Sequence, residues 1–171
     1  VHGRIDVLSA NAGMGEIESM GAITEAGFDR VFATNVKGTT FTVQGALPLM
    51  GEGSSVVIIG STSSINPGPG MSVYGATKAA LRALVRSWIL DIRGSGVRIN
   101  LLSPGPVDTP SLRDVLGENA QQVIGLLNEK STLGRIGQAH EIGQAALFLA
   151  SDASSYVNGA ELFADGGASQ V

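Results

Sequence analysis

Apolar positions along the chain alternate between short continuous runs and stretches with helical spacing. The short runs are typical of buried strands and occupy residues 5–10, 55–60, 97–102 and 159–164. Helical spacing predicts helices between and after them, over residues 24–50, 72–93, 112–127 and 140–151. Because strands alternate with helices throughout, we expect an α/β fold with a parallel sheet of about four strands and helices on both faces.

The predicted helix 72–93 is apolar on two faces. One face carries small side chains such as Ala76 and Ala83, and the other carries bulky ones such as Leu81 and Trp88. A helix of this kind is usually covered on both sides. We expect the sheet on one side and a partner subunit on the other.

Composition narrows the class of protein. The 171 residues are 43% hydrophobic and 15% charged, which predicts one core-rich globular domain over residues 1–171. A net charge of −4 without a basic run argues against nucleic acid or a membrane surface as a partner. The chain has no cysteine, and its two histidines lie far apart, so we expect no metal site. No signal peptide is recognisable, and a cytoplasmic protein is expected.

Three side chains near the second predicted strand suggest proton-transfer chemistry. Ser61 follows that strand, and Tyr74 and Lys78 are four residues apart, so they share one face of a helix. A nearby ammonium favours the phenolate, and we expect Lys78 to draw the pKa of Tyr74 from ~10 towards neutrality. A phenol tuned in this way can exchange a proton with a carbonyl or alcohol oxygen.

The other candidate polar groups follow strands as well. Turns at residues 11–13, 60–61 and 103–105 each come after a predicted strand. In an open parallel sheet, ligands bind beyond the carboxyl ends of the strands. All of these groups are therefore expected on one rim of the sheet.

With these motifs in place, the chain resembles the short-chain dehydrogenase/reductase family, whose fold is a doubly wound, Rossmann-like sheet. Ser61 lies thirteen residues before Tyr74, as that family requires. The other matching motifs are Ala10-Asn11-Ala12-Gly13, Thr34-Asn35-Val36-Lys37-Gly38, Tyr74-Gly75-Ala76-Thr77-Lys78, Ser103-Pro104-Gly105, Phe148-Leu149-Ala150-Ser151 and Asp165-Gly166-Gly167. They appear in the family's order and cover nearly the whole chain.

The resemblance implies an NAD(P)-dependent oxidoreductase that interconverts an alcohol and a ketone by hydride transfer. Tyr74 would be the catalytic acid/base, and Lys78 would lower its pKa and hold the nicotinamide ribose. Ser61 would hydrogen-bond the substrate oxygen, and Asn35 would hold a water in a proton relay. A small-molecule carbonyl or alcohol is the implied substrate.

The resemblance also implies a set of cofactor contacts and an assembly. Besides Tyr74 and Lys78, residues on the ribose side and at the nicotinamide end would contact NAD or NADP. They are Asn11, Ala12 and Gly13, then Pro104, Gly105, Val107 and Thr109. In the family, helices corresponding to residues 24–50 and 72–93 form a dimer interface, so a homo-oligomer (dimer or tetramer) is expected.

Simpler interpretations stay open for three of these residues. Ser61 could merely cap its turn, with Ser63 or Ser64 taking its role. Asn35 could bond nearby backbone. Asn11 could be a turn residue that tolerates a left-handed conformation.

The family's Gly-rich cofactor turn and the residue that selects NAD or NADP are not found in this sequence. The chain matches the family from its fourth strand onward, so we expect a truncated, C-terminal portion of the fold, with residues 5–10 as an apolar edge strand. The choice between NAD and NADP is left open. The alternative function is a truncated, non-catalytic assembly module derived from this family.

Overall fold

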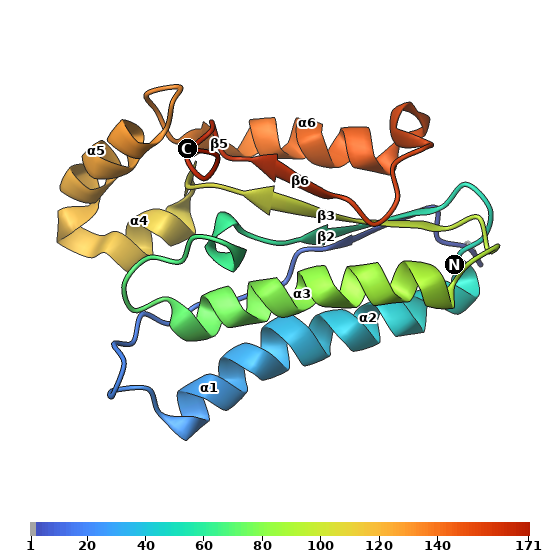
Figure 1. Cartoon of the computed structure of the whole chain (residues 1–171), viewed down its shortest axis with the longest axis horizontal. Helices are drawn as coiled ribbons and strands as arrows, with labels where there is room; N and C mark the ends of the chain where they lie inside the picture. The colour runs from blue at the N-terminus through green and yellow to red at the C-terminus, as the bar shows by residue number, and fades with distance from the viewer. Residues whose placement is uncertain (1–2) are drawn as a thin grey trace.

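The computed structural model describes residues 3–171, and its centre is one parallel sheet. The strands run in the order β1-β2-β3-β6. Their bounds are β1 (Val7–Ala10), β2 (Ser55–Ile59), β3 (Arg98–Pro104) and β6 (Glu161–Ala164). Helices cover both faces of this sheet (Figure 1), which confirms the predicted α/β architecture.

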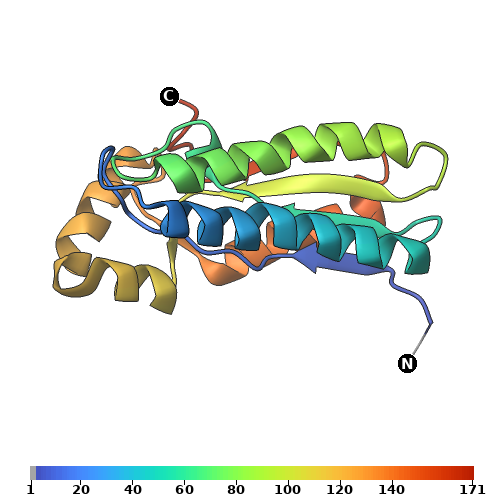
Figure 2. The ribbon, with the colours of Figure 1, turned by 90° about the horizontal axis from the view of Figure 1, so that it is seen from below.

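Within residues 3–171, six α-helices lie on the faces of the sheet or beyond its carboxyl end. They are α1 (Glu25–Phe32), α2 (Thr39–Ala46), α3 (Ser72–Asp91), α4 (Pro110–Leu116), α5 (Ala120–Lys130) and α6 (Ala139–Ala150). The α1–α2 rod and α3 lie side by side on one face (Figure 2), and α6 lies on the other (Figure 1). Helices α4 and α5 lie beyond the carboxyl ends of the strands, where a ligand would bind in an open α/β sheet.

Successive side chains of the middle strands point to opposite faces of the sheet, and both faces are buried, which explains the continuous apolar runs in the sequence. On β2, Val56 and Ile58 face the core formed with Leu81 and Val85 of α3. Val57, between them, belongs to the second core under α6. Since both faces are covered, successive side chains are all buried. Burial of each such aliphatic side chain stabilises the folded state by roughly 1.5–3 kcal/mol.

The predicted helix 24–50 is interrupted. A π-helical segment, Ala33–Gly38, separates α1 from α2, and a 3₁₀ turn, Leu47–Leu49, ends the rod. The predicted helix 112–127 is likewise two helices, because Gly117 between them adopts φ +55°, which breaks the helical path.

A small second sheet pairs β4 (Val107–Asp108) with β5 (Gly137–Gln138). Strands of two residues leave no periodic signal in the sequence, so this sheet was not predicted.

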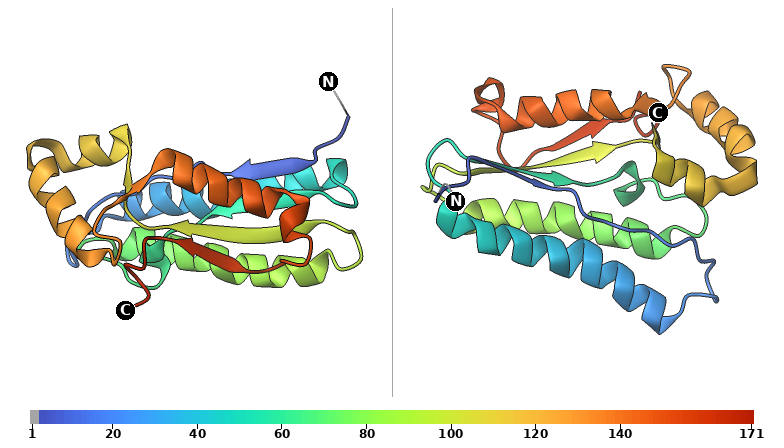
Figure 3. Two further views of the ribbon diagram at one scale, coloured as in Figure 1. Left: turned by 90° about the horizontal axis from the view of Figure 1, so that it is seen from above. Right: turned by 180° about the vertical axis from the view of Figure 1, so that it is seen from behind.

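In the main sheet of the described residues, β1 and β6 are the two edges (Figure 3). Val7 on β1 is 48% exposed, so the first strand is an apolar edge as expected.

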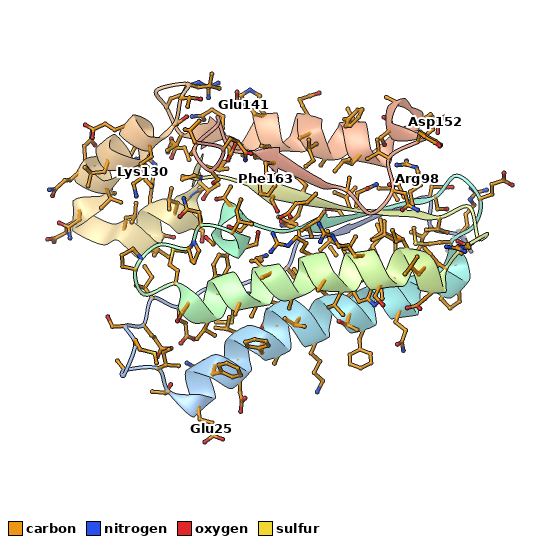
Figure 4. All side chains as sticks on the ribbon, in the orientation of Figure 1. Glu25, Arg98, Lys130, Glu141, Asp152 and Phe163 are labelled. Carbon is orange, nitrogen blue, oxygen red and sulfur yellow. The ribbon has the colours of Figure 1, made fainter. Side chains whose placement is uncertain are left out.

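A buried arginine ties β3 to the end of α6. Arg98 lies at the start of β3, close to the turn that carries Asp152 (Figure 4). Its guanidinium donates to the carbonyl oxygens of Leu149 and Ser151, both at 3.1 Å, and to Ser154 Oγ at 2.8 Å. These acceptors sit at the negative end of the α6 dipole, which favours a cation.

Candidate active site

The end of β2 and the start of α3 carry the first two site residues. Ser61 follows β2 and begins a short 3₁₀ turn, Thr62–Ser64, which we call the serine turn. The Oγ of Ser61 accepts a hydrogen bond from the Ser63 amide at 3.1 Å. Tyr74 lies in the first turn of α3, and the nearby Ser61 side chain acts to lower the pKa of its phenol. Ser61 therefore both caps its turn and lies beside the phenol.

Lys78 completes this group from the next turn of α3. Its ammonium is buried, lies 5.6 Å from the centre of the Tyr74 ring and donates to the carbonyl oxygen of Ile59 at 2.8 Å. Ile59 is the last residue of β2. The structure thus brings Ser61, Tyr74 and Lys78 together at the carboxyl end of one strand.

Burial dominates the electrostatics of the pair on α3. It raises the pKa of Tyr74, while the hydrogen bond from Ser61 acts in the opposite direction. Burial lowers the pKa of Lys78 to about 8. The expected displacement of the Tyr74 pKa towards neutrality is therefore wrong for this structure, because desolvation of the phenol outweighs the lowering influence of Ser61.

Asn35 is fully buried in the π-helical segment and joins three parts of the chain. Its Oδ1 accepts from the Met14 amide at 2.8 Å, and its Nδ2 donates to the Met14 carbonyl at 2.8 Å and to Thr77 Oγ1 at 3.0 Å. Thr77 in turn donates to the carbonyl of Tyr74. Asn35 thus bonds the backbone of Met14, 21 positions away, and not the nearby backbone of its own helix. π-Helical segments occur frequently at functional sites.

The loop after β1 approaches the same group through glycines. A Cβ at Gly13 would lie 3.4 Å from both Asn35 Oδ1 and Lys78 Nζ, and one at Gly15 would lie 3.1 Å from the Tyr74 ring. Asn11 and Ala12, before them, are exposed. Within residues 3–171 no residue other than glycine has positive φ, so Asn11 is not a left-handed turn residue.

The four predicted residues after β3 lie on the same rim. Pro104 ends β3, and Gly105 packs so closely on Asp165 that a Cβ there would lie 2.8 Å from Asp165 Cα. Val107 belongs to β4, and Thr109 caps α4 by accepting from the Leu112 amide at 3.2 Å. Across the described residues, none of the four hydrogen-bonds to Ser61, Tyr74 or Lys78.

Several contributors to the site were missed from the sequence. Met14 and Ile59 act through backbone groups, which carry no residue-specific signal. Thr77 lies inside the Tyr74–Lys78 motif, and its position three residues after Tyr74 could have indicated it. Gly15 lies beside the Tyr74 ring, but nothing distinguishes it from other loop glycines in the sequence.

Residues 1–169 match the family model described as enoyl-(acyl carrier protein) reductase. The chain is 44% identical over 171 residues to oxidoreductase asL5 of Sarocladium schorii, covering 99% of this chain and 68% of that protein. It is 35% identical over 168 residues to the 3-oxoacyl-[acyl-carrier-protein] reductase FabG of Thermotoga maritima, covering 97% and 67%.

Solved structures agree. Ligand-free aldohexose dehydrogenase of Thermoplasma acidophilum superposes with a TM-score of 0.94 at 28% identity, covering 99% of this chain and 70% of that one. The angucycline C-6 ketoreductase LanV with bound NADP gives a TM-score of 0.90 at 26% identity, covering 98% and 64%. The chain belongs to the short-chain dehydrogenase/reductase family of NAD(P)-dependent oxidoreductases. It spans about two thirds of the length of these relatives.

The described residues contain neither a helix that could span a membrane nor a metal-binding cluster. None of their helices is long and apolar enough to cross a membrane. No group of three or more histidine, aspartate or glutamate side chains gathers within residues 3–171 in a way that could hold a metal ion.

Proposed function

We propose that this protein interconverts an alcohol and a ketone by hydride transfer, with Tyr74 as the acid/base. The observation that supports the proposal is the meeting of the Ser61 hydroxyl, the Tyr74 phenol and the Lys78 ammonium at the end of β2. A phenol held between a hydroxyl and a cation can donate a proton to a carbonyl oxygen, or take one from an alcohol. The substrate is a small carbonyl or alcohol compound.

Each neighbour of Tyr74 has a distinct part in this proposal. The Ser61 hydroxyl lies beside Tyr74 and, with substrate present, donates its single O–H to the substrate oxygen. Lys78 uses one N–H for Ile59, and its other N–H groups would hold the nicotinamide ribose of a bound cofactor. Asn35 uses both Nδ2 hydrogens and one Oδ1 lone pair for Met14 and Thr77, and its remaining Oδ1 lone pair holds a water of the proton relay.

The site suits NAD or NADP at its nicotinamide end. Gly13 and Gly15 leave a cradle beside Lys78 and Tyr74 that a Cβ would narrow. The residues proposed to line the bound cofactor are Asn11, Ala12 and Gly13, then Pro104, Gly105, Val107 and Thr109. The cofactor, when bound, supplies or accepts the hydride, and this chain's own groups hold the ribose and move the proton.

We further propose that these residues form the C-terminal portion of the family's fold. The apolar edge at β1, where Val7 is exposed, supports this assignment, because an edge strand of this kind is normally paired or covered. The alcohol–ketone interconversion is likewise a proposal for the whole protein, of which these residues would be the C-terminal portion.

A second candidate, assembly through the outer face of the α1–α2 rod, has its own support. The rings of Phe28 and Phe32 stack there with centroids 4.4 Å apart, and Phe41 is 57% exposed. A shallow groove on the rod runs from Asp29 past Ala33 to Phe41. An apolar groove with a charged rim is typical of a protein interface.

The charges beside this groove fit a second copy of the chain. Asp29 and Lys37 are both exposed and lie four residues on either side of Ala33. A two-fold axis near Ala33 would place Asp29 of one copy opposite Lys37 of the other, twice, which is the self-complementary arrangement of a symmetric dimer. A dimer, or a tetramer built from it, is therefore proposed.

The function is tested by cofactor binding and turnover. Titration with NADH and NADPH should show binding, and a panel of carbonyl compounds should reveal turnover. Tyr74→Phe should lower turnover by about 10²–10⁴-fold. Tyr156→Phe, at a fully exposed tyrosine, is the matched control and should change nothing. Near-normal activity of Tyr74→Phe would exclude the acid/base role, and failure to bind either cofactor would favour the assembly module.

A further inference from the structure

Glu161 is a buried carboxyl residue outside the site described above. It lies at the start of β6, and its side chain is only 10% exposed. Its Oε1 accepts from Ser103 Oγ at 2.7 Å and from Ser64 Oγ at 3.2 Å, and its Oε2 lies 3.5 Å from Arg82 Nη1. The rest of β6, Leu162–Ala164, is apolar. A carboxyl group in such a place is costly unless donors surround it.

Two of the three donors around Glu161 come from the elements that carry the proposed acid/base site, and the third, Ser103, lies on β3. Ser64 ends the serine turn, and its amide also donates to the Ser61 carbonyl at 3.0 Å. Arg82 lies on α3, eight residues beyond Tyr74. Glu161 therefore connects the turn that presents Ser61 to the helix that presents Tyr74.

The serine turn packs closely against α3 and β3, so it has little room to move. A Cβ at Gly75 would lie 2.7 Å from the Ser63 carbonyl, so the serine turn rests directly on the first turn of α3. At Gly60, just before Ser61, a Cβ would collide with the Ser103 hydroxyl that Glu161 holds. A shift of Ser64 or Ser103 would therefore be passed on to Ser61.

We propose that Glu161 is a positioning residue that holds the Ser61 hydroxyl on Tyr74 through its hydrogen bonds to Ser64 and Ser103. The proposal rests on the proposed function, in which Ser61 and Tyr74 act together. Glu161 touches neither the phenol nor the site for the substrate oxygen; it acts through the serine turn.

Titration of Tyr74 provides a readout that needs no turnover. The chain has two tyrosines, and Tyr156→Phe leaves the phenolate absorbance of Tyr74 alone to be followed with pH. If Glu161 positions Ser61, Glu161→Ala should raise the pKa of Tyr74 by up to about one unit, because the lowering influence of the Ser61 hydroxyl is lost. If Glu161 acted only through negative charge, its removal would lower that pKa instead.

Companion variants separate positioning from a loss of stability. Ser61→Ala should raise the Tyr74 pKa by the same amount, and the double variant should raise it no further. Glu161→Gln keeps an acceptor oxygen and should not raise it. Ser55→Ala removes a buried hydrogen bond to the Leu149 carbonyl, away from the serine turn, and should leave the pKa unchanged. If Glu161→Ala does not fold, Ser64→Ala cuts the same link and should raise the pKa.

An unchanged or lowered Tyr74 pKa in Glu161→Ala, or in Ser64→Ala when the former does not fold, overturns the proposal. This outcome is distinct from failure of the proposed function, which is decided by the turnover of Tyr74→Phe. A raised pKa supports the positioning role even if Tyr74→Phe retains activity.

Discussion

The Lys78 ammonium lies 5.6 Å from the centre of the Tyr74 ring and donates to the last carbonyl of β2, not to the phenol. The cation is thus held beside the phenol without ion pairing to it. Both groups are buried, and burial disfavours the charged form of each. A ligand that accepts hydrogen bonds from the ammonium would favour the charged amine.

Lys78 should make stability depend on pH. Its folded-state pKa of about 8 lies below its ordinary value of 10.5, so the charged amine opposes folding below pH 8. This cost, about 3 kcal/mol, disappears as the pH rises from about 8 to about 10.5. Lys78→Met, which cannot titrate, should gain stability relative to wild type at pH 7 and lose that gain across this window.

Chemical denaturation of both proteins at each pH gives the comparison. The difference in unfolding free energy between wild type and Lys78→Met removes the contributions of other titrating groups. One of these is Tyr74, whose raised pKa makes stability fall as the pH rises above 10.0, the ordinary pKa of a tyrosine. A stability difference that stays constant between pH 7 and pH 10.5 would contradict the prediction.

Asn35→Ala should impair both stability and activity. The change leaves the Met14 amide and carbonyl without their partner and should lower the free energy of unfolding by about 1–3 kcal/mol. Asn100 is the matched control, because it is equally buried and bonds the Val157 carbonyl and the Ala160 amide. Asn100→Ala should cost similar stability but leave the turnover of the folded fraction unchanged. Equal turnover in the two variants would argue against a role for Asn35 in the relay.

Arg98→Lys should destabilise the end of α6. A lysine ammonium cannot reproduce the spread of the guanidinium across Leu149, Ser151 and Ser154, so we expect a loss of about 2 kcal/mol. Hydrogen exchange should increase around residues 149–157 before the rest of the sheet. Arg86→Lys, on the exposed side of α3, is the control and should behave as wild type.

Charge reversal should test the proposed dimer. Asp29→Lys alone, or Lys37→Asp alone, should weaken dimerisation about tenfold, because each places like charges opposite each other at two symmetric positions. The double variant restores opposite charges and should recover the dimer. Sedimentation velocity over a range of concentrations measures this. Recovery that fails in the double variant would rule out the two-fold arrangement about Ala33.

Sequence patterns predicted the parts of the fold and site that depend on local regularity. The strand 55–60 and the helix from residue 72 were predicted because buried strands and long helices impose strict apolar patterns. Tyr74 and Lys78 were paired because helical spacing places them on one face. The parallel sheet with helices on both faces then followed from the alternation of elements.

Features that depend on distant contacts were not predicted. Glu161 bonds Ser64 from 97 positions away, and nothing local indicates that its strand passes behind the serine turn. The direction of the Tyr74 pKa shift depends on burial, which spacing does not give. The π-helical segment was missed because its apolar pattern resembles that of a continuous helix.

That π-helical segment lets one rod present two unrelated surfaces. Asn35 faces the loop after β1, while Ala33 and Lys37 line the outer groove. Removing one residue from the segment would restore ordinary helical winding and rotate everything after it by about 100°. The Asn35 side chain could not then face the loop after β1 while Ala33 and Lys37 line the outer groove. We therefore expect a deletion or insertion in this segment to be tolerated less well than a substitution.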